Sequence, residues 1–362
     1  MSYRPIKAII NLNALQHNLQ VAKQLAPQSK VLAVIKANGY GHGIERVAKQ
    51  LSAADGFGVA SIDEALVLRQ KGFLHRILLL EGLFCEQELP LVVQNRLDLV
   101  VHSQYQLQWL LDFEHKNQLN IWIKIDTGMH RLGFHPDAVE GVIHQLETSA
   151  NKYQIHLMSH FANADDNSAV GKKFTLQQKT AFHSSIQTSD FPQSLANSAA
   201  LFHYPKTQLD WVRPGILLYG AGYNKRIKSQ LNLKPVMKLQ SQIQALHWVP
   251  KGESVGYGNR WTAPKDSLIA VVAIGYGDGY PRHAPDGTPV SVRGHRMPLA
   301  GRVSMDMITI DITKFADQID IGDTVTLWGD ELVSVDEVAD LCGTIGYELL
   351  CGITARVPII EQ

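Results

Sequence analysis

The 362-residue sequence has few cysteines and no net charge. Its three cysteines, Cys85, Cys342 and Cys351, have spacings that fit neither a disulfide framework nor a zinc site, so we expect a reducing, cytoplasmic environment. Lysine plus arginine and aspartate plus glutamate each total 34 residues, which leaves no overall field to attract nucleic acid or an anionic membrane. Small neutral or zwitterionic ligands fit this composition better.

Long apolar segments and repeats are also missing. Residues 1–15 contain only the short apolar run Ala8-Ile9-Ile10, so we expect neither a signal peptide nor a transit peptide, and no run approaches membrane-spanning length. We find no repeat period and no low-complexity tract. Because the chain exceeds what one hydrophobic core usually supports, we expect two domains.

The first two-thirds of the chain alternates apolar runs with helical patterns. Runs that are apolar on both faces are typical of parallel strands buried between a core and a helical layer. The expected strands are 31–37, 56–61, 77–82, 97–103, 121–127, 155–161, 194–198 and 211–219. Eight such units predict a (β/α)8 TIM barrel over residues 1–230, whose first few residues may instead pair with the second domain. Ser61 with Glu64 and Ser103 with Gln106 resemble capping boxes at two of its helix starts.

From about residue 231 the expected strands follow one another directly, with turns between them. They cover residues 236–247, 268–274, 290–293, 305–310 and 324–328, and one helix begins near Ser334 and Glu337 and ends at Gly343. This order predicts a mostly β C-terminal domain over residues 231–362, and the segment 223–234 is the expected crossing between the domains.

Residues 31–43 are the stretch on which the functional interpretation depends. Five apolar residues form a strand that Lys36 closes, and three glycines then precede a helical pattern. Lys36 is either a side chain that extends out of a strand end to reach water or a lysine that forms a Schiff base.

Other strands of the expected barrel also end in polar residues, where barrel enzymes place their sites. Taken singly, His160 could be a structural histidine and Ser198 a helix N-cap. Arg213 lies in an apolar strand, and such strands rarely carry arginine unless the guanidinium has an acceptor. That acceptor is either a structural ion-pair partner or a ligand.

Motifs along nearly the whole chain resemble those of alanine racemases, which are pyridoxal 5'-phosphate-dependent enzymes of fold type III. The similar segments are 34–43, with the cofactor lysine, 126–133, 159–162, 197–200, 212–216, 255–258, 275–280, 301–307 and 344–348. Gly39 and Gly346 depart from the family, where alanine and asparagine respectively are common. Neither departure removes a functional side chain.

The resemblance implies an isomerase that interconverts L-alanine and D-alanine by two-base racemisation through an external aldimine of the cofactor. Lys36 and Tyr257 would be the catalytic residues, acting on opposite faces of the alpha carbon, as racemisation requires. Similarity assigns the support of Tyr257 to His160 and Arg213, with Arg213 donating to the pyridine nitrogen of the cofactor.

Similarity also assigns binding roles to other residues. Those implied for the cofactor are Lys36, Tyr40, His160, Asn197, Ser198, Arg213, Gly215, Ile216 and Tyr347. The substrate carboxylate would meet Arg131 and the backbone of Met305, with Tyr276 and Asp306 near the entrance. Lys124 is either an unmodified structural lysine or a carbamylated lysine that orients Arg131. No metal is expected.

The C-terminal motifs around Tyr257 and Tyr276 would by themselves be read as turns with buried aromatic residues. The resemblance makes Tyr257 catalytic and implies a homodimer in which this tyrosine and Met305 complete the site of the partner subunit.

Three alternatives stay open: a broader amino-acid racemase that accepts serine, a fold-type III decarboxylase, and a non-catalytic pyridoxal-phosphate-binding protein. Tyr257 and Arg213 argue against the decarboxylase, and the added C-terminal domain with its tyrosine argues against the non-catalytic protein. The sequence does not distinguish a role in supplying D-alanine for cell-wall peptidoglycan from a role in alanine catabolism.

Overall fold

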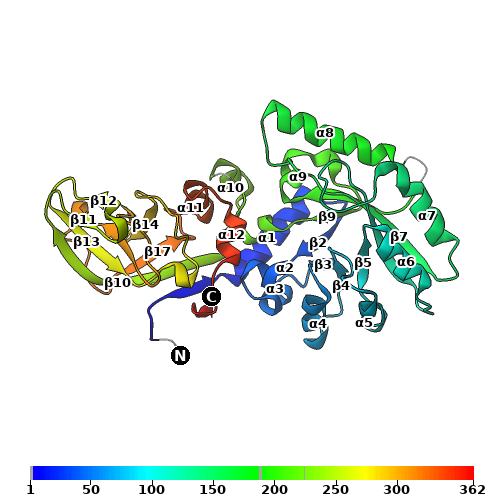
Figure 1. The fold of residues 1–362 in the computed structure, drawn as a ribbon, viewed down its shortest axis with the longest axis horizontal. Coiled ribbons are helices and arrows are strands. Elements are labelled where there is room, and N and C mark those ends of the chain that lie inside the picture. The colour runs from blue at the N-terminus through cyan, green and yellow to red at the C-terminus, as the bar shows by residue number, and fades with distance from the viewer. Residues whose placement is uncertain (1–2, 187–189, 224) are drawn as a thin grey trace. The chain divides into compact units, whose positions relative to one another are not determined.

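A computed structural model describes residues 3–186, 190–223 and 225–362, and the chain divides into two compact units. One unit comprises residues 19–39 and 43–218, and the other comprises residues 1–18, 40–42 and 219–362. Figure 1 labels the elements of both units in chain order. No helix in the described ranges is both long enough and apolar enough to cross a membrane.

The first unit contains a closed barrel of eight parallel strands, as the alternating sequence pattern predicted. Neighbouring strands follow chain order, and β2 closes the ring by pairing with β9, with Val31 opposite Val212. The strands are β2 (Lys30–Val34), β3 (Gly56–Val59), β4 (Arg76–Leu79), β5 (Asp98–Val101), β6 (Leu119–Lys124), β7 (Tyr153–Met158), β8 (Gln193–Asn197) and β9 (Trp211–Arg213).

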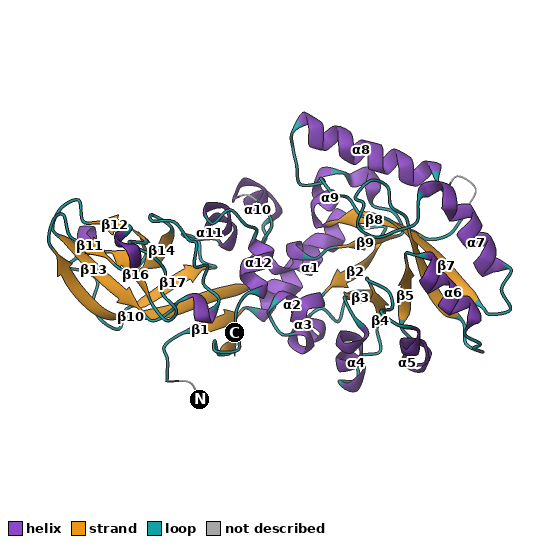
Figure 2. Cartoon of the chain, in the orientation of Figure 1, coloured by secondary structure: helices purple, strands orange, loops and turns teal. Residues whose placement is uncertain are grey.

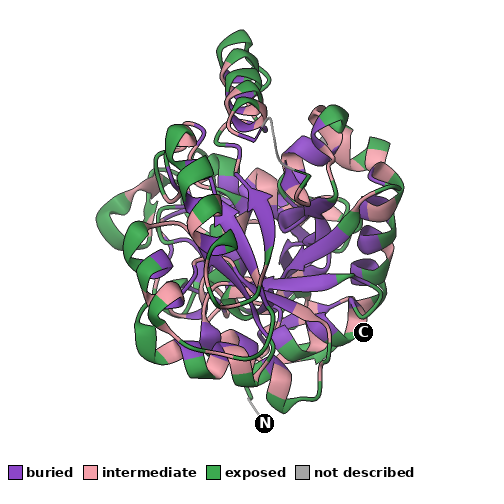
Figure 3. Ribbon diagram, turned by 90° about the vertical axis from the view of Figure 1, so that its right-hand side faces the viewer, coloured by how far each residue is buried: buried purple, intermediate pink, exposed green. Residues whose placement is uncertain are grey.

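Helices surround the barrel, and their outward faces are exposed whereas the strands are buried (Figure 3). They are α3 (Ile44–Gln50), α4 (Ile62–Gln70), α5 (Leu89–Gln94), α6 (Gln104–Asp112), α7 (Val139–Glu147), α8 (Ala169–Ser184) and α9 (Ser198–His203), while α1 (Leu12–Leu25) precedes the first barrel strand. Inside the barrel, side chains such as Leu32, Leu78 and Trp122 pack into one apolar cluster. The interior is therefore a packed core.

Two of the expected capping boxes are wrong. The hydroxyls of Ser61 and Ser103 make no cap hydrogen bond, although both residues occupy the N-cap position. Instead, the Glu64 carboxylate accepts from the Ala60 N–H at 2.9 Å, and the Gln106 side chain accepts from the His102 N–H at 3.1 Å. The carboxylate and the amide thus bind the chain one residue before the expected cap.

The second unit is built on an antiparallel sheet to which residues from both ends of the sequence contribute (Figure 2). Strand β1 pairs with β10 antiparallel and with β18 parallel. The strands are β1 (Lys7–Ile10), β10 (Met237–Val249), β11 (Ser254–Val255), β12 (Trp261–Thr262), β13 (Ser267–Val272), β14 (Pro289–Val292), β15 (His295–Pro298), β16 (Ile308–Asp311), β17 (Thr324–Trp328) and β18 (Ile359–Glu361).

Three helices accompany this sheet where the sequence predicted one. Helix α11 (Val335–Leu341) begins at the expected N-cap, where the Ser334 hydroxyl accepts from the Glu337 N–H. Helix α12 (Gly346–Cys351) and helix α10 (Lys225–Leu231) were not predicted. Strand β16 begins at Ile308 and not at Met305, so Met305 lies in the preceding loop.

A charged cluster lies at the amino-terminal end of the barrel strands. The Arg76 guanidinium forms an ion pair with buried Asp98 at 2.8 Å, and the same carboxylate accepts from the Trp122 indole N–H at 2.9 Å. The His156 ring stacks on Trp122 with centroids 4.5 Å apart, and its Nε2 lies 3.3 Å from Arg76. In barrels this end serves stability.

Burial, followed by the positive charge of Arg76, lowers the pKa of His156 from 6.5 to about 4. Because the pKa of His156 is depressed in the folded chain, only the unfolded chain protonates this histidine as the pH falls from 6.5 to about 4. The free energy of unfolding should therefore fall by up to roughly 3 kcal/mol through this one group.

We predict that His156→Gln makes the pH dependence of stability less steep between pH 6.5 and 4, because the titrating group is removed. Urea unfolding of wild type and variant across this range measures the difference. His135→Gln, at an exposed side chain, is the matched control and should keep the wild-type slope. Equal slopes for wild type and His156→Gln would contradict the prediction.

Candidate functional site

Lys36 follows the first barrel strand but does not belong to it, which corrects the predicted strand end. Strand β2 ends at Val34, and the Lys36 side chain, 37% exposed, begins a turn in which the next four residues have left-handed backbone angles. Their φ values are 52° for Ala37, 54° for Asn38, 63° for Gly39 and 52° for Tyr40. Each non-glycine residue in this conformation costs about 1–2 kcal/mol. Such a turn forms only if surrounding contacts hold it.

Asn38 supplies these contacts within the barrel unit. Its side-chain oxygen accepts from the Ile44 N–H at 2.9 Å, and its carbonyl accepts from the Gly43 N–H at 2.8 Å. Its own N–H donates to the Glu64 carboxylate at 3.1 Å. Asparagine tolerates the left-handed region better than most residues, so this side chain both adopts the turn and ties it to the start of helix α3.

Glu81, which the sequence analysis missed, lies beside Lys36. Its carboxylate is 3.6 Å from the Lys36 amine, and it lies two residues after the end of strand β4. The signal was available, because a charged residue closes the apolar run 77–80 as Lys36 closes its own. The contact gives the amine an anionic neighbour in the absence of any ligand.

Arg213, the last residue of strand β9, is 3% exposed. Its guanidinium donates to the Ser159 carbonyl at 2.5 Å and to the Ser194 hydroxyl, and it lies 3.4 Å from His160 Nδ1. No carboxylate within the described ranges forms an ion pair with it, so the structural ion pair considered from the sequence is not present there. Burial lowers the pKa of Arg213 to about 10, which leaves the group charged at neutral pH.

His160 is held neutral by these surroundings. Burial, followed by the positive charge of Arg213, lowers its pKa well below the usual 6.5. Because Arg213 can only donate, Nδ1 of His160 must accept, and the remaining ring proton then lies on Nε2. The pair is therefore a directed donor chain from arginine to histidine.

Asn197, and not Ser198, is the N-cap of helix α9. The Asn197 side chain accepts from the Ala200 N–H at 3.0 Å. The freed Ser198 hydroxyl, which is buried, accepts from the Gly215 N–H at 2.9 Å and from the Leu217 N–H at 3.3 Å. Ser198, which follows strand β8, and the segment 215–217, which follows strand β9, thus bring a hydroxyl and backbone N–H donors together. Ile216, which begins a 3-10 turn, lies between those donors, where a continuous strand had been expected.

Lys124 ends strand β6 and is 7% exposed. Its pKa is lowered from 10.5 to about 7, first by burial and then by the positive charges of Arg213, Arg131 and Lys36, in that order. Four cationic side chains predicted from separate motifs therefore lie near one another in the barrel unit. A group of cations at the carboxyl ends of barrel strands favours an anionic ligand.

Arg131 lies on an exposed loop that Asp126 organises. The Asp126 carboxylate accepts from the N–H groups of Gly128 and His130, both at 3.0 Å. A Cβ at Gly133, where φ is 134°, would lie 2.5 Å from the Asp126 nitrogen, so the loop closes only over glycine. These contacts explain why the spacing of the 126–133 motif positions the arginine.

The remaining predicted residues belong to the second unit. Tyr40 is buried and stacks on Tyr219 with centroids 4.6 Å apart, and Tyr347 lies at 5.8 Å. Burial raises the pKa of Tyr40 above its ordinary value, so its hydroxyl stays protonated and can donate. Tyr257, Tyr276, Met305 and Asp306 are exposed, and Tyr257 is 69% accessible. The alternative of a turn with a buried aromatic residue is therefore wrong for Tyr257, whereas in residues 275–280 Tyr276 is 37% exposed and Tyr280 is buried.

The fold and these side chains define a barrel protein with a cation-lined site and an added β unit. Residues 10–222 match the family described as alanine racemase, N-terminal domain, and residues 236–361 match alanine racemase, C-terminal domain. The chain therefore belongs to the alanine racemase family.

Individual relatives agree over nearly the full length. The chain is 49% identical to the alanine racemase of Vibrio cholerae, over 97% of this chain and 96% of that protein. The solved biosynthetic alanine racemase of Pseudomonas aeruginosa is 46% identical, with a TM-score of 0.94 over 99% of each chain. That of Acinetobacter baumannii is 41% identical, with a TM-score of 0.91 over 99% of this chain and all of that one.

The left-handed turn after Lys36 yields a stability prediction. A Cβ at Gly39 would lie 2.9 Å from Val47 Cγ2, so Gly39→Ala should lower the free energy of unfolding by about 1 kcal/mol or more through strain and this overlap. The pair Gly39→Ala with Val47→Ala should cost less than the sum of the single changes, because the second removes the overlap. Denaturant unfolding of all four proteins measures this coupling.

Gly72→Ala is the matched control for the backbone term. Gly72 has a φ of 83° with no atom within 4 Å of an added Cβ, so it reports left-handed strain without overlap. Strictly additive costs at positions 39 and 47 would contradict the predicted overlap.

Proposed function

We propose that this chain interconverts L-alanine and D-alanine. The observation that carries the proposal is the full-length match to both racemase domains together with Lys36 and Tyr257 at the matching motif positions. Alanine racemases from several bacteria share 46–49% of their residues with it. An amine and a phenol provide the two proton-carrying groups that inversion at one carbon needs.

We propose pyridoxal 5'-phosphate as the cofactor, and the residues present fit it. The partly exposed Lys36 side chain offers an amine for the aldehyde of the cofactor. Buried Arg213, without a described anionic partner, offers a donor for its ring nitrogen. The N–H groups around Ser198 offer donors for its phosphate. When bound, the cofactor withdraws electrons from the alpha carbon of the substrate. Lys36 would bind the aldehyde of the cofactor, and Arg213 would donate to its ring nitrogen. Its phosphate would be held by Ser198, Gly215, Ile216, Tyr40 and Tyr347.

The protein side chains would then move and position protons. Lys36 would act on one face of the alpha carbon and Tyr257 on the other, with neutral His160 and Arg213 supporting the tyrosine. Arg213 keeps its own proton, so it would donate to the ring nitrogen and keep it unprotonated, while Asn197 caps helix α9, which begins at Ser198. Arg131 and the Met305 backbone would bind the substrate carboxylate, and Tyr276 and Asp306 would line the entrance.

Lys124 is proposed to carry a carbamate. An amine with a pKa of about 7 is largely neutral just above that pH, as attack on carbon dioxide requires, and the product anion would offset the neighbouring cations. A carbon-13 carbamate signal that needs labelled bicarbonate and disappears in Lys124→Met checks the assignment.

We further propose the functional domains 1–230 and 231–362 and a cytoplasmic homodimer with shared sites, which binds neither nucleic acid nor membrane. All three thiols of the chain are free, as a reducing compartment allows. Tyr257 and Met305 expose 69% and 52% of their surface, and large exposed side chains of this kind favour contact with a partner subunit over exposure to solvent. The product would serve peptidoglycan synthesis, or the enzyme would act in alanine catabolism.

The activity test uses purified protein loaded with cofactor, L-alanine or L-serine, and deuterium oxide, followed by chiral analysis. We expect D-alanine with deuterium at the alpha carbon, and a loss of turnover on the order of 10²–10⁴-fold in Tyr257→Phe, which lacks the proton-carrying hydroxyl. Tyr105→Phe, at another exposed tyrosine, should keep wild-type turnover. Faster turnover of serine than of alanine would move the proposal to the broader racemase, and no turnover of either would refute it.

Sharing of the site is tested by mixing two inactive variants. Lys36→Ala and Tyr257→Phe homodimers each lack one group at both sites, whereas a mixed dimer places both defects in one site and leaves the other intact. Random exchange makes half of the dimers mixed, so activity should recover to about a quarter of wild type. If subunit exchange is verified and activity stays absent, each site is built within one chain.

A further inference from the structure

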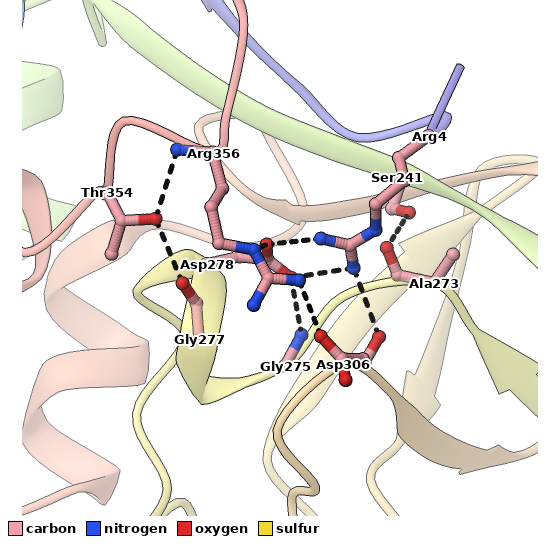
Figure 4. Close-up of polar contacts among 9 residues, drawn as sticks. All are labelled: Arg4, Ser241, Ala273, Gly275, Gly277, Asp278, Asp306, Thr354 and Arg356. Carbon is pink, nitrogen blue, oxygen red and sulfur yellow. Dashed lines mark hydrogen bonds and ion pairs between the residues drawn. The ribbon is translucent and has the colours of Figure 1, made fainter. Parts of the chain in front are cut away.

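Asp278 is a fully buried carboxylate in the second unit, inside the turn that carries Tyr276. A buried carboxylate is costly unless it is paired and hydrogen-bonded. Arg4 pairs with it through both oxygens, at 2.6 and 2.9 Å, and the Gly275 N–H donates to Oδ2 at 3.0 Å. Figure 4 shows these groups converging on one carboxylate.

Arg356 joins this carboxylate to a second one. Its Nε lies 3.2 Å from Asp278 Oδ1, and its Nη2 donates to Asp306. Arg4 also donates to the backbone carbonyl of Asp306 at 3.3 Å. The cluster therefore contains two arginines and two aspartates from four separate segments, and its formal charges cancel. We name these residues, Arg4, Asp278, Asp306 and Arg356, the four-charge cluster.

Backbone hydrogen bonds connect the same turn to the loop that carries Met305. The Tyr276 N–H donates to the Ser304 carbonyl at 3.0 Å, and the Gly277 N–H donates to the Met305 carbonyl at 2.9 Å. On the other side, the Thr354 hydroxyl donates to the Gly277 carbonyl at 2.9 Å. The turn thus lies between the Met305 loop and the segment before β18.

The glycines of the 275–279 motif permit this close packing. An added Cβ would lie 2.4 Å from the Met305 carbonyl carbon at Gly275, 2.4 Å from Arg356 Nη1 at Gly277, and 2.3 Å from the Gly352 carbonyl at Gly279. Gly279 also has a φ of 104°. The motif spacing is therefore explained by packing around Asp278, in addition to presenting Tyr276.

From these contacts we propose that Asp278 is a positioning residue that fixes the Met305 backbone for the substrate carboxylate and Tyr276 at the entrance, with Arg4 and Arg356 as its anchors. The inference rests on the proposed function, which assigns these two positions to Met305 and Tyr276. Asp278 itself is buried beneath them and acts through the turn. An isosteric neutral amide at this position keeps the volume but weakens both arginine bonds, so the turn and the Met305 loop lose their common anchor.

The test compares Asp278→Asn with Asp323→Asn in the cofactor-loaded enzyme. Asp323 forms an exposed pair with Arg293 through two contacts of 2.7 Å in the same unit, so it controls for loss of a bidentate ion pair. Asp278→Asn should raise the KM for both alanine enantiomers on the order of tenfold while cofactor absorbance stays unchanged. Because enantiomers have equal free energies, kcat/KM must fall by the same factor in both directions, which checks the data internally.

Arg356→Lys is the milder second variant, because it keeps the charge but lacks the planar guanidinium whose Nε and Nη2 contact the two carboxylates. It should raise KM in the same direction by a smaller factor. If Asp278→Asn does not fold, Arg356→Lys carries the test alone. A thermal stability loss with wild-type KM and kcat in every folded variant would show a merely structural role and overturn the inference.

Hydrogen exchange separates failure of this inference from failure of the proposed function. In Asp278→Asn, or in Arg356→Lys, amide exchange should rise in residues 275–279 and 304–307 but not in Asp323→Asn. A wild-type enzyme that does not racemise alanine refutes the function, and the exchange result then still decides whether Asp278 holds the two segments. Unchanged exchange in both peptides overturns the inference whatever the activity.

Discussion

The barrel site depends on a positive charge that is buried without a described counter-ion. Arg213 keeps its proton because even the lowered pKa of about 10 lies far above neutral pH. That fixed charge makes His160 an acceptor and helps to push the Lys124 amine toward neutrality. A single guanidinium therefore adds to the effect of burial on the protonation of two neighbours, and the energetic cost of burying it is offset by four protein acceptors.

The architecture could be predicted because it follows from periodicity. Runs mostly apolar on both faces, together with a weaker run at 194–198, located the eight barrel strands, and motif spacing found the side chains that gather at their ends. Very short strands such as Ser254–Val255 and Trp261–Thr262 could not be predicted, since two residues carry no periodic signal. The helix Gly346–Cys351 was not predicted either, because six residues show less than two helical turns of the pattern.

Local geometry was less predictable, for reasons that particular residues make clear. The glycines after Lys36 indicate a tight turn, and Asn38 tolerates a left-handed backbone, but nothing in the sequence shows that Ala37 and Tyr40 also adopt one. Contacts of Asn38 with Ile44 and Glu64 stabilise this turn. The serines at 61 and 103 have the right spacing for caps, yet neither hydroxyl makes a cap hydrogen bond, and the longer side chains three residues on bind the N–H groups of Ala60 and His102. Which backbone N–H a side chain reaches is decided by distances that a sequence does not contain.

The pairing of β1 with β18 has a consequence for how the molecule forms. Ala8 lies opposite Ile359, and the Gln362 N–H donates to the Ile10 carbonyl at 2.9 Å, so the sheet of the second unit joins segments about 350 positions apart. During synthesis the barrel strands emerge in order and each meets its neighbour soon after it appears. Strand β1 is made long before β18, so the edge that pairs with β18 stays uncovered until that strand has been synthesised. An unpaired edge of this kind is open to association with other chains, so this edge of β1 is a point at which the newly made protein can misassemble.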